Sequence, residues 1–241
     1  MITEESFIDF ECPYCGGAVS FPQINAKSLQ ACPSCLEALI VPETTGEVGR
    51  KIPIPITTPR LILRRLQGGD WKDLLELLSK EEMFAHSNRG PMEEQEIVRW
   101  LETDGSVKLT TPNEAFFLGI QVQDSGKLIG YVRLDFTDER LQALVSACVS
   151  PSYQRNGIAT EAVSALLDFC FNEISLHRVQ TRCDNRDVAA RRLCEKVGLR
   201  REGESLKDRF VKGEWISHVW YARLDEEHRA ERSGNTPESA A

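Results

Sequence analysis

The segment that most constrains the fold runs from Leu144 to Phe171, where a polar turn joins an apolar run to an amphipathic stretch. Its first part, LVSACV, is typical of a buried strand, and its last part repeats apolar residues at helical spacing. The turn carries a single glycine, Gly157, which permits backbone conformations that a β-carbon penalises. The segment therefore predicts a strand, a turn and a helix. The apolar positions of the expected helix are Ala162, Val163, Leu166, Leu167, Cys170 and Phe171.

The start of the expected helix is suited to an anionic ligand. A helix N-terminus leaves main-chain N–H groups unpaired and carries a partial positive charge of roughly +0.5. A turn with few large side chains lets a phosphate reach those donors, and Gln154 and Arg155 add polar groups at its mouth. A pyrophosphate fits the amides available. A glycine-containing loop that only turns the chain is about equally consistent with these residues taken alone.

Charge is unevenly distributed along the 241 residues, whose net charge is −8. Residues 59–224 hold 24 basic and 25 acidic side chains, so the acidic surplus belongs to the two ends. A near-neutral body offers little attraction to a phosphate backbone, so nucleic acid is not the expected partner. No apolar run reaches the ~18 residues of a membrane span, and the acidic start MITEESFIDFE does not resemble a secretory signal. We expect a cytoplasmic protein with reduced thiols and no membrane partner.

The chain divides into three zones and a tail. Residues 8–40 are rich in cysteine. Residues 41–59 contain four prolines and two glycines, which predicts an extended linker. Residues 60–224 carry the periodic apolar patterns of a folded domain, and residues 225–241 are small and polar, which predicts a disordered tail.

Strand-like and helix-like segments are mixed within residues 60–224, with a hairpin meander first and βαβα order afterwards, which predicts a mixed α/β (α+β) fold. Asp70 is expected to cap the first helix, Gly126 to lie in a hairpin turn, and Gly198 to end the last helix. The expected strands are residues 60–66, 116–123, 127–136, 144–149, 177–183 and 213–224, and the expected helices are residues 70–79, 93–102, about 157–173 and 188–197.

Several blocks resemble, in collinear order, the GNAT superfamily of N-acetyltransferases. QRNGIA, residues 154–159, resembles the acetyl-CoA signature R/Q-x-x-G-x-G/A of that superfamily. The wider string PSYQRNGIATEAVSALLDFCF resembles the Rim-type subfamily, which includes the ribosomal-protein N-terminal acetyltransferases. TPRLILRRL, CDNRDVAARRLCEKVGLRREG and GEWISHVWYARL resemble its opening strand, second block and closing strand. The resemblance covers about residues 57–224.

This resemblance implies a GNAT fold, a twisted mixed sheet that splays open after its fourth strand, here LVSACV. It implies that an acetyl group moves from acetyl-CoA to a primary amine, for which a protein N-terminal α-amine is the candidate. The thioester would lie between residues 144–149 and 177–183. The pantetheine would pair near Cys148 and Val149, and the pyrophosphate would bind the amides from Arg155 to Thr160. The implied cofactor-binding residues are Cys148, Val149, Gln154, Arg155, Asn156, Gly157, Ile158, Ala159 and Thr160.

The groups that move protons in relatives are replaced in this chain. GNAT chemistry needs a base or a water path for the ammonium proton and an acid for the departing thiolate. Rim-type relatives often place a glutamate seven residues before the proline that ends the fourth strand, and that position is Leu144. They often carry an asparagine and, three residues later, a serine in the second block, where this chain has Asp187 and Ala190. Many GNATs carry a tyrosine acid where this chain has Cys194.

Two residues remain as candidate catalytic groups. Cys194 offers a thiol proton, although a small buried side chain is the more common role of such a cysteine. Asp187 offers a carboxylate base, although a helix cap is the more common role at that place. His86 and His218 titrate near neutrality, and each is expected to be a surface or hydrogen-bonded histidine. The alternative function is a catalytically idle, CoA-binding domain that serves a protein-interaction module.

Four cysteines near the N-terminus follow the pattern C-x2-C-x16-C-x2-C, a spacing that matches a four-thiolate zinc site. The module resembles a zinc ribbon, and CPYCGG and CPSC suit the tight turns that direct two sulfurs at one metal. Four ligands leave no open position, so the zinc is expected to be structural and to supply folding energy to a module of ~30 residues. A rubredoxin-like iron site and a redox dithiol are the alternatives. The expected ligands are Cys12, Cys15, Cys32 and Cys35.

The sequence says less about the partner of the ribbon and about which amine is acetylated. Lys27 is the only basic residue from 10 to 40, which favours a protein partner for the ribbon over nucleic acid. Acceptor choice is expected to depend on the loops around residues 83–92, 104–114 and 204–214. The other cysteines, Cys148, Cys170, Cys183 and Cys194, are expected to be small core residues.

Overall fold

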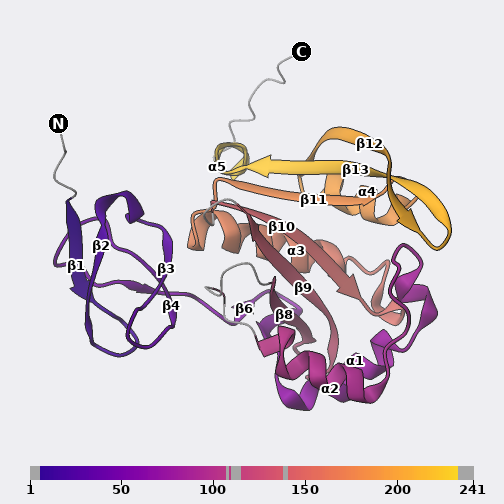
Figure 1. The fold of residues 1–241 in the computed structure, drawn as a ribbon, viewed down its shortest axis with the longest axis horizontal. Helices are drawn as coiled ribbons and strands as arrows, with labels where there is room; N and C mark the ends of the chain where they lie inside the picture. Colours follow the sequence, from indigo (N-terminus) through magenta and orange to yellow (C-terminus); the bar gives the residue numbers. More distant parts are fainter. Residues whose placement is uncertain (1–5, 107–108, 110–114, 138–140, 233–241) are drawn as a thin grey trace.

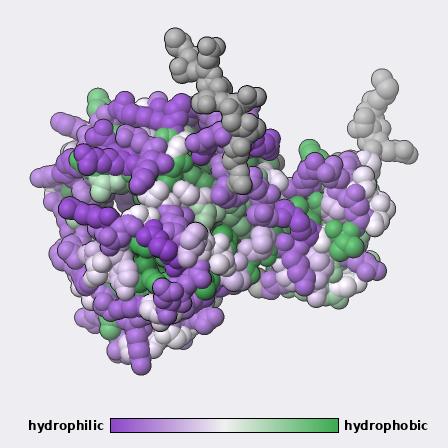
Figure 2. Space-filling model, turned by 180° about the vertical axis from the view of Figure 1, so that it is seen from behind, coloured by the Kyte–Doolittle hydropathy of each residue, from purple (hydrophilic) through white to green (hydrophobic). Residues whose placement is uncertain are grey.

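The computed structural model describes residues 6–106, 109, 115–137 and 141–232. A small β-rich module, residues 6 to about 51, lies beside a larger domain built on one mixed sheet (Figure 1). The space-filling view shows the two parts as lobes in contact (Figure 2). Among the described helices, none has the length and apolar character needed to cross a membrane.

Eight strands form the sheet of the larger domain, in the order β12-β13-β11-β10-β9-β8-β7-β6. Only β10 and β11 run parallel, and all other neighbours are antiparallel. This arrangement confirms the mixed α/β class predicted from the sequence. The strands are β6 (Ile56–Thr57), β7 (Leu61–Arg65), β8 (Ala115–Val122), β9 (Leu128–Thr137), β10 (Gln142–Val149), β11 (Arg178–Asp184), β12 (Arg200–Val211) and β13 (Glu214–Leu224).

Helices cover both faces of this sheet. Ala162 and Leu166 of α3 pack into the main core on one face. Leu74 of α1 and Ile97 of α2 pack with Phe117 in a second core on the other face. The helices are α1 (Trp71–Leu78), α2 (Glu94–Glu102), α3 (Ile158–Asp168), which continues as a π-helical turn (Phe169–Glu173), α4 (Val188–Lys196) and α5 (Asp225–Arg232).

Asp70 does not cap α1 in the way that the sequence predicted. It precedes the first residue of the helix, but its side chain makes no capping hydrogen bond to α1. Its carboxylate instead accepts a hydrogen bond from the Gln67 amide at 2.7 Å and pairs with Arg64 at 2.7 and 2.8 Å. The buried charge of Asp70 is compensated by the guanidinium of Arg64, so this residue fixes the turn before the helix.

The sheet splays open between β10 and β11. These strands pair only from Gln142 and Arg178 to Leu144 and Gln180. Beyond that point β10 remains paired with β9 on its other side as far as Val149. The splay after the fourth strand of the GNAT pattern is therefore confirmed.

Gly130 permits the close approach of β9 to the end of β10. It lies opposite Val149 in the register, and a β-carbon at this position would lie 2.1 Å from the carbonyl oxygen of Cys148. A side chain would have to displace main-chain atoms, so only glycine fits without a shift of the strand.

The N-terminal module has five short strands and a core of its own. Ile8, Phe10, Val19, Leu39 and Val41 pack around the buried thiols of two of its cysteines. Its strands are β1 (Phe7–Glu11), β2 (Ala18–Pro22), β3 (Leu29–Ala31), β4 (Ala38–Ile40) and β5 (Arg50–Lys51).

Residues 41–59, expected to be a linker, contribute structure to both parts of the molecule. Strand β5 pairs with β4 of the module, and β6 pairs with β7 of the large sheet. The connection is therefore short and ordered, because both of its ends are held in sheets.

The module packs against the large domain through one face of β4. Alternate residues of a strand point to opposite faces, and here Leu39 lies in the core of the module while Ala38 and Ile40 join the main core of the large domain. Leu29 and Ile52 extend the same contact. Ion pairs flank it, between Arg50 and Glu173 and between Arg65 and Glu37.

The first part of the expected disordered tail is a helix. Residues 225–232 form α5, and its His228 is buried against the ring of Phe171, with ring centroids 4.8 Å apart. The Leu224 amide donates a hydrogen bond to Glu227, an acidic residue in the first turn, where the helix dipole favours negative charge. Residues 233–241 lie outside the described part of the chain.

Candidate functional site

The glycine turn presents a row of free main-chain donors at the start of α3. Gly157 has φ 76° and is the N-cap of the helix, and Arg155 before it has φ 61°. The first amide of the helix that donates within the chain is that of Glu161, whose acceptor is the Gly157 carbonyl oxygen. None of the amides from Arg155 to Thr160 donates a hydrogen bond to another described residue. These donors and the positive pole of the helix suit the turn to a phosphate group.

Arg60 and Glu161 hold this turn against the first strand of the domain. The Arg60 guanidinium donates to Glu161 at 2.6 Å and to the carbonyl oxygen of Asn156 at 2.9 Å. Glu161 also accepts hydrogen bonds from the Thr58 hydroxyl at 2.6 Å and from the Arg60 amide at 2.9 Å. Burial favours the neutral acid, but the hydrogen bonds from Thr58 and Arg60 prevail and lower the pKa of Glu161. The turn is therefore preorganised by a charged network.

The end of β10 leaves one main-chain edge without a neighbouring strand. The ladder with β11 stops at Leu144, so the edge from Val145 to Val149 that faces β11 has no strand beside it. The side-chain amide of Gln154 donates to the Val149 carbonyl oxygen at 2.9 Å. An extended ligand such as a pantetheine arm can add to such an edge.

The side chain of Cys148 faces away from that edge, toward Tyr131 on β9. Cys148 packs with Tyr131 in the core beneath α1 and α2. Burial raises the pKa of the Cys148 thiol to about 11, and burial also raises the pKa of Tyr131. Both groups are therefore neutral near pH 7. The thiol of Cys148 therefore has a packing role. The pantetheine contact that the sequence predicted at Cys148 would involve its main-chain atoms.

The two predicted catalytic residues lie at and within α4, on the β11 side of the opening. Asp187 is the N-cap of α4, because its Oδ1 accepts the Ala190 amide at 2.9 Å. Its other oxygen, Oδ2, lies 3.9 Å from Nε2 of His86. Cys194 is buried, and its hydrogen bond with Cys183, followed by burial, raises the pKa of its thiol. Cys194 is therefore protonated at neutral pH.

His86 lies at the open end of β11, a placement that the sequence did not indicate. Its Nδ1 is 3.1 Å from Oδ2 of Asp184, whose side chain is 1% exposed. Hydrogen bonds from Arg186, supported by His86, hold the pKa of Asp184 well below its usual range. His86 and Asp184 are 98 residues apart, so no local pattern relates them.

The segment that contains His86 continues to the hairpin of β12 and β13. The Asn88 side chain donates to the Phe210 carbonyl oxygen at 2.8 Å and accepts the Lys212 amide at 2.9 Å. Figure 1 shows this segment, between α1 and α2, reaching the tip of the hairpin on the open side of the splay. Two of the three segments expected to select the acceptor, residues 83–92 and 204–214, therefore meet here. Residues 204–211 belong to β12, and residues 107–108 and 110–114 of the third segment lie outside the described part.

His218, the other histidine considered from the sequence, lies opposite Asp184 in the register of β11 and β13. His218 of β13 is buried, and its Nδ1 is 2.8 Å from Asp208. The expectation of a hydrogen-bonded histidine agrees with this geometry.

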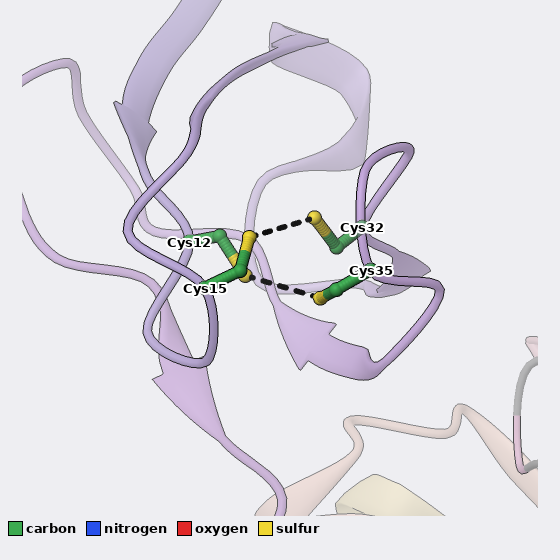
Figure 3. A group of neighbouring side chains, drawn as sticks. All are labelled: Cys12, Cys15, Cys32 and Cys35. Atoms are coloured by element: carbon green, nitrogen blue, oxygen red, sulfur yellow. Dashed lines mark hydrogen bonds between the residues drawn. The ribbon is translucent and has the colours of Figure 1, made fainter.

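The four cysteines of the N-terminal module converge on one point (Figure 3). Their sulfur atoms all lie within 4.8 Å of one another, with 3.8 Å between Cys12 and Cys35 and 3.9 Å between Cys15 and Cys32. A tetrahedron with metal–sulfur bonds of about 2.3 Å has sulfur–sulfur edges of about 3.8 Å. The donor set and its spacing therefore fit a four-thiolate metal ion.

Comparisons with known proteins concern the large domain and agree with its fold. The family described as "Acetyltransferase (GNAT) domain" matches residues 60–200. The uncharacterized N-acetyltransferase YnaD of Bacillus subtilis (strain 168) is 29% identical over 173 residues, which cover 71% of this chain and 98% of that relative. The crystal structure of a GNAT-family acetyltransferase from Bacillus anthracis matches with a TM-score of 0.65 and 25% identity, over 71% of this chain and 99% of its own. The fold is also that of spermidine N-acetyltransferase from Vibrio cholerae, solved with CoA and spermine, with a TM-score of 0.62 at 20% identity over 71% and 99% of the two chains.

Proposed function

We propose, given that the chain belongs to the GNAT acetyltransferase family and is an acetyl-CoA-dependent N-acetyltransferase, that its acceptor is a primary amine at a protein N-terminus. The resemblance of its sequence blocks to the Rim-type subfamily suggests this acceptor. The small polyamine bound in one structural neighbour is the main competitor.

The free amides of the glycine turn are the main support for an acetyl-CoA site at this place. In this proposal the pyrophosphate of acetyl-CoA binds the amides from Arg155 to Thr160, with the guanidinium of Arg155 beside it. The pantetheine arm adds to the free edge of β10 near Val149, which requires Gln154 to release the Val149 carbonyl oxygen. The thioester then lies in the splay between β10 and β11, where an amine can approach from the face covered by α1 and α2.

The charges around the opening favour a singly charged acceptor over a polyamine. Three carboxylates near it are paired with cations, Asp184 with Arg186, Asp135 with Arg133, and Glu81 with Lys212. Asp187, which caps α4, lies 3.9 Å from His86 and can contact one ammonium group. A polyamine carries several positive charges and needs unpaired carboxylates along its length. A peptide N-terminus needs one anionic contact and apolar surface, and Phe210 and Trp215, both exposed, form an edge-to-face pair at the hairpin tip with centroids 5.5 Å apart.

Release of the coenzyme A thiol tests this assignment directly. The protein is incubated with acetyl-CoA and, in separate reactions, with peptides of varied N-terminal residue, with spermidine and with free lysine. Higher kcat/KM for peptide α-amines, lost when the peptide is formylated at its N-terminus, is the expected result. Higher kcat/KM for spermidine would overturn the acceptor, and binding of acetyl-CoA without turnover of any amine would favour the idle CoA-binding domain.

We also propose that the cysteine cluster holds a structural zinc ion. Cys12, Cys15, Cys32 and Cys35 supply four thiolates at tetrahedral spacing and leave no position for a substrate. The ion would cross-link two chain turns of a module too small to fold firmly on its core alone. Metal analysis of the purified protein tests the proposal, since one zinc per chain is expected and iron would indicate the rubredoxin-like alternative.

A further inference from the structure

The segment that carries His86 spans the mouth of the splay. On one side, Met83 and Phe84 pack in the same core as Tyr131 of β9, the strand that pairs with β10. On the other side, Asn88 and Lys212 link the segment to the β12–β13 hairpin. His86 lies between these contacts, with its ring at the last residue of β11. Its side chain is 43% exposed, so a substrate in the mouth can reach it.

The carboxylate of Asp184 determines which nitrogen of His86 carries the proton. Asp184 is ionised, because Arg186 donates to both of its oxygens and holds its pKa low. An ionised carboxylate 3.1 Å from Nδ1 requires a proton on that nitrogen. Neutral His86 therefore has its lone pair on Nε2, which faces Asp187 Oδ2 at 3.9 Å. That pair of acceptors, one neutral and one anionic, is complementary to an ammonium group.

We propose that His86 is the general base that accepts the ammonium proton of the acceptor, that Asp187 binds the ammonium group, and that Asp184 is a positioning residue. This inference rests on the proposed N-acetyltransferase function. One N–H bond of the ammonium breaks and an Nε2–H bond forms, which leaves a neutral amine. The amine attacks the thioester carbonyl, the carbon–sulfur bond breaks, and the remaining surplus proton of the nitrogen passes to the departing thiolate. The products are the amide and the coenzyme A thiol, and His86 returns its proton to water.

This assignment supplies the base that β10 lacks. Leu144 stands where Rim-type relatives often carry a glutamate, and no carboxylate of β10 replaces it, because the strand reads QALVSACV. His86 reaches the same opening from the opposite wall. The charged groups in contact with it are Asp184 of β11 and Asp187 at the start of α4. Arg186 pairs with Asp184 and with Glu214 of β13, and on the neighbouring segment and hairpin Glu81 pairs with Lys212.

A second histidine–aspartate pair of the same geometry provides a matched control. His177 precedes β11 at its other end, and its Nδ1 also lies 3.1 Å from a carboxylate oxygen, that of Asp225. His177 is 61% exposed and far along the strand from the splay. If such pairs only fasten a loop, replacing either histidine will have the same small effect on turnover.

The test is the pH profile of kcat/KM for an N-terminal peptide with wild type, His86→Gln and His177→Gln. At pH 7, where an α-amine of pKa about 7.7–8.0 is mostly protonated, His86→Gln is expected to lose about 10²-fold in kcat/KM. The loss should shrink as the pH rises above the pKa of the amine. It should also shrink with hydroxylamine as acceptor, since that amine is largely neutral at pH 7. His177→Gln should follow wild type at every pH.

Further measurements on the His86 variants distinguish the loss of a general base from unfolding of the protein and from a failure of the proposed function. Acetyl-CoA affinity and melting temperature of His86→Gln are expected to match wild type, and imidazole should restore part of the turnover of His86→Ala. A pH-independent loss, or a loss shared equally by His177→Gln, would overturn the base while leaving the enzyme intact. Absence of turnover by wild type with acetyl-CoA bound would overturn the proposed function, and the base with it.

Discussion

Arg60, which directly precedes β7, and Glu161 in the first turn of α3 form a salt bridge of 2.6 Å beside the glycine turn. The same guanidinium donates to the Asn156 carbonyl oxygen, so one side chain links the strand, the turn and the helix. The turn therefore exposes its amides in a fixed arrangement. A ligand that binds them does not have to order the loop first, which lowers the entropic cost of binding.

The acid stability of the domain should depend on Glu161. Its pKa lies below the usual 4.5 in the folded state, so the stability it contributes is present above about pH 4.5 and is lost as the pH falls through the lower folded value. Glu161→Gln should lower the melting temperature at pH 7 and flatten its dependence on pH between about 5 and 3. Glu76→Gln is the control, because Glu76 has a similar 2.6 Å contact with Lys127 but is exposed, and such pairs contribute little. Equal pH profiles of Glu161→Gln and wild type would contradict this account.

The contact between the ribbon and the large domain should contribute to the stability of both. Ile40 is 5% exposed and lies in the main core although it belongs to the ribbon. Ile40→Ala should cost about 2–5 kcal/mol of unfolding free energy, measured by denaturant titration. Ile24→Ala is the matched control, since Ile24 is 91% exposed and should be neutral. Equal effects of the two substitutions would show that the lobes do not pack as described.

Removal of the proposed zinc ion should therefore destabilise more than the ribbon. The thiols of Cys12 and Cys32 lie in the ribbon core, and that core adjoins β4, which also packs on the large domain. Cys32→Ser, or treatment of wild type with a strong chelator, should release about one zinc and lower the melting temperature of the acetyltransferase domain. The readouts are metal content and thermal unfolding followed by the tryptophans, all of which lie outside the ribbon. An unchanged melting temperature after complete metal loss would show that the ion does not stabilise the acetyltransferase domain.

Features set by neighbouring residues were predictable from the sequence. Gly157, Gly126 and Gly198 all have positive φ, as a turn or helix end requires. Asp187 caps α4, and the two cysteine knuckles meet at metal-binding distances. The family blocks predicted the splay of the sheet. For the glycines, Asp187 and the cysteines the physical cause lies within a few residues or in a regular spacing, whereas the splay was predicted from the resemblance to a family.

Features that depend on distant contacts were missed or predicted wrongly. The pairing of His86 with Asp184 joins elements 98 residues apart, and nothing local marks either residue. Proline content predicted an extended, exposed linker over residues 41–59, whereas its residues 50–51 pair with β4 and its residues 56–57 pair with β7. Asp70 was expected to cap a helix, but the nearby Arg64 and the Gln67 amide engage its carboxylate instead. The tail from residue 225 begins as a helix because His228 finds a buried place against Phe171.

The measurement closest to the central claim is calorimetric titration of acetyl-CoA into wild type, Gly157→Glu and Gly126→Glu. Both glycines have positive φ, and a β-carbon at either would lie 3.5 Å from a side-chain nitrogen, so the two substitutions impose similar strain. Only Gly157→Glu places a carboxylate at the free amides, and it should weaken binding at least about 100-fold, or ~2.7 kcal/mol, while Gly126→Glu binds as wild type does. Equal affinity of Gly157→Glu and wild type, or no binding by wild type, would contradict the assignment of the glycine turn as the acetyl-CoA site.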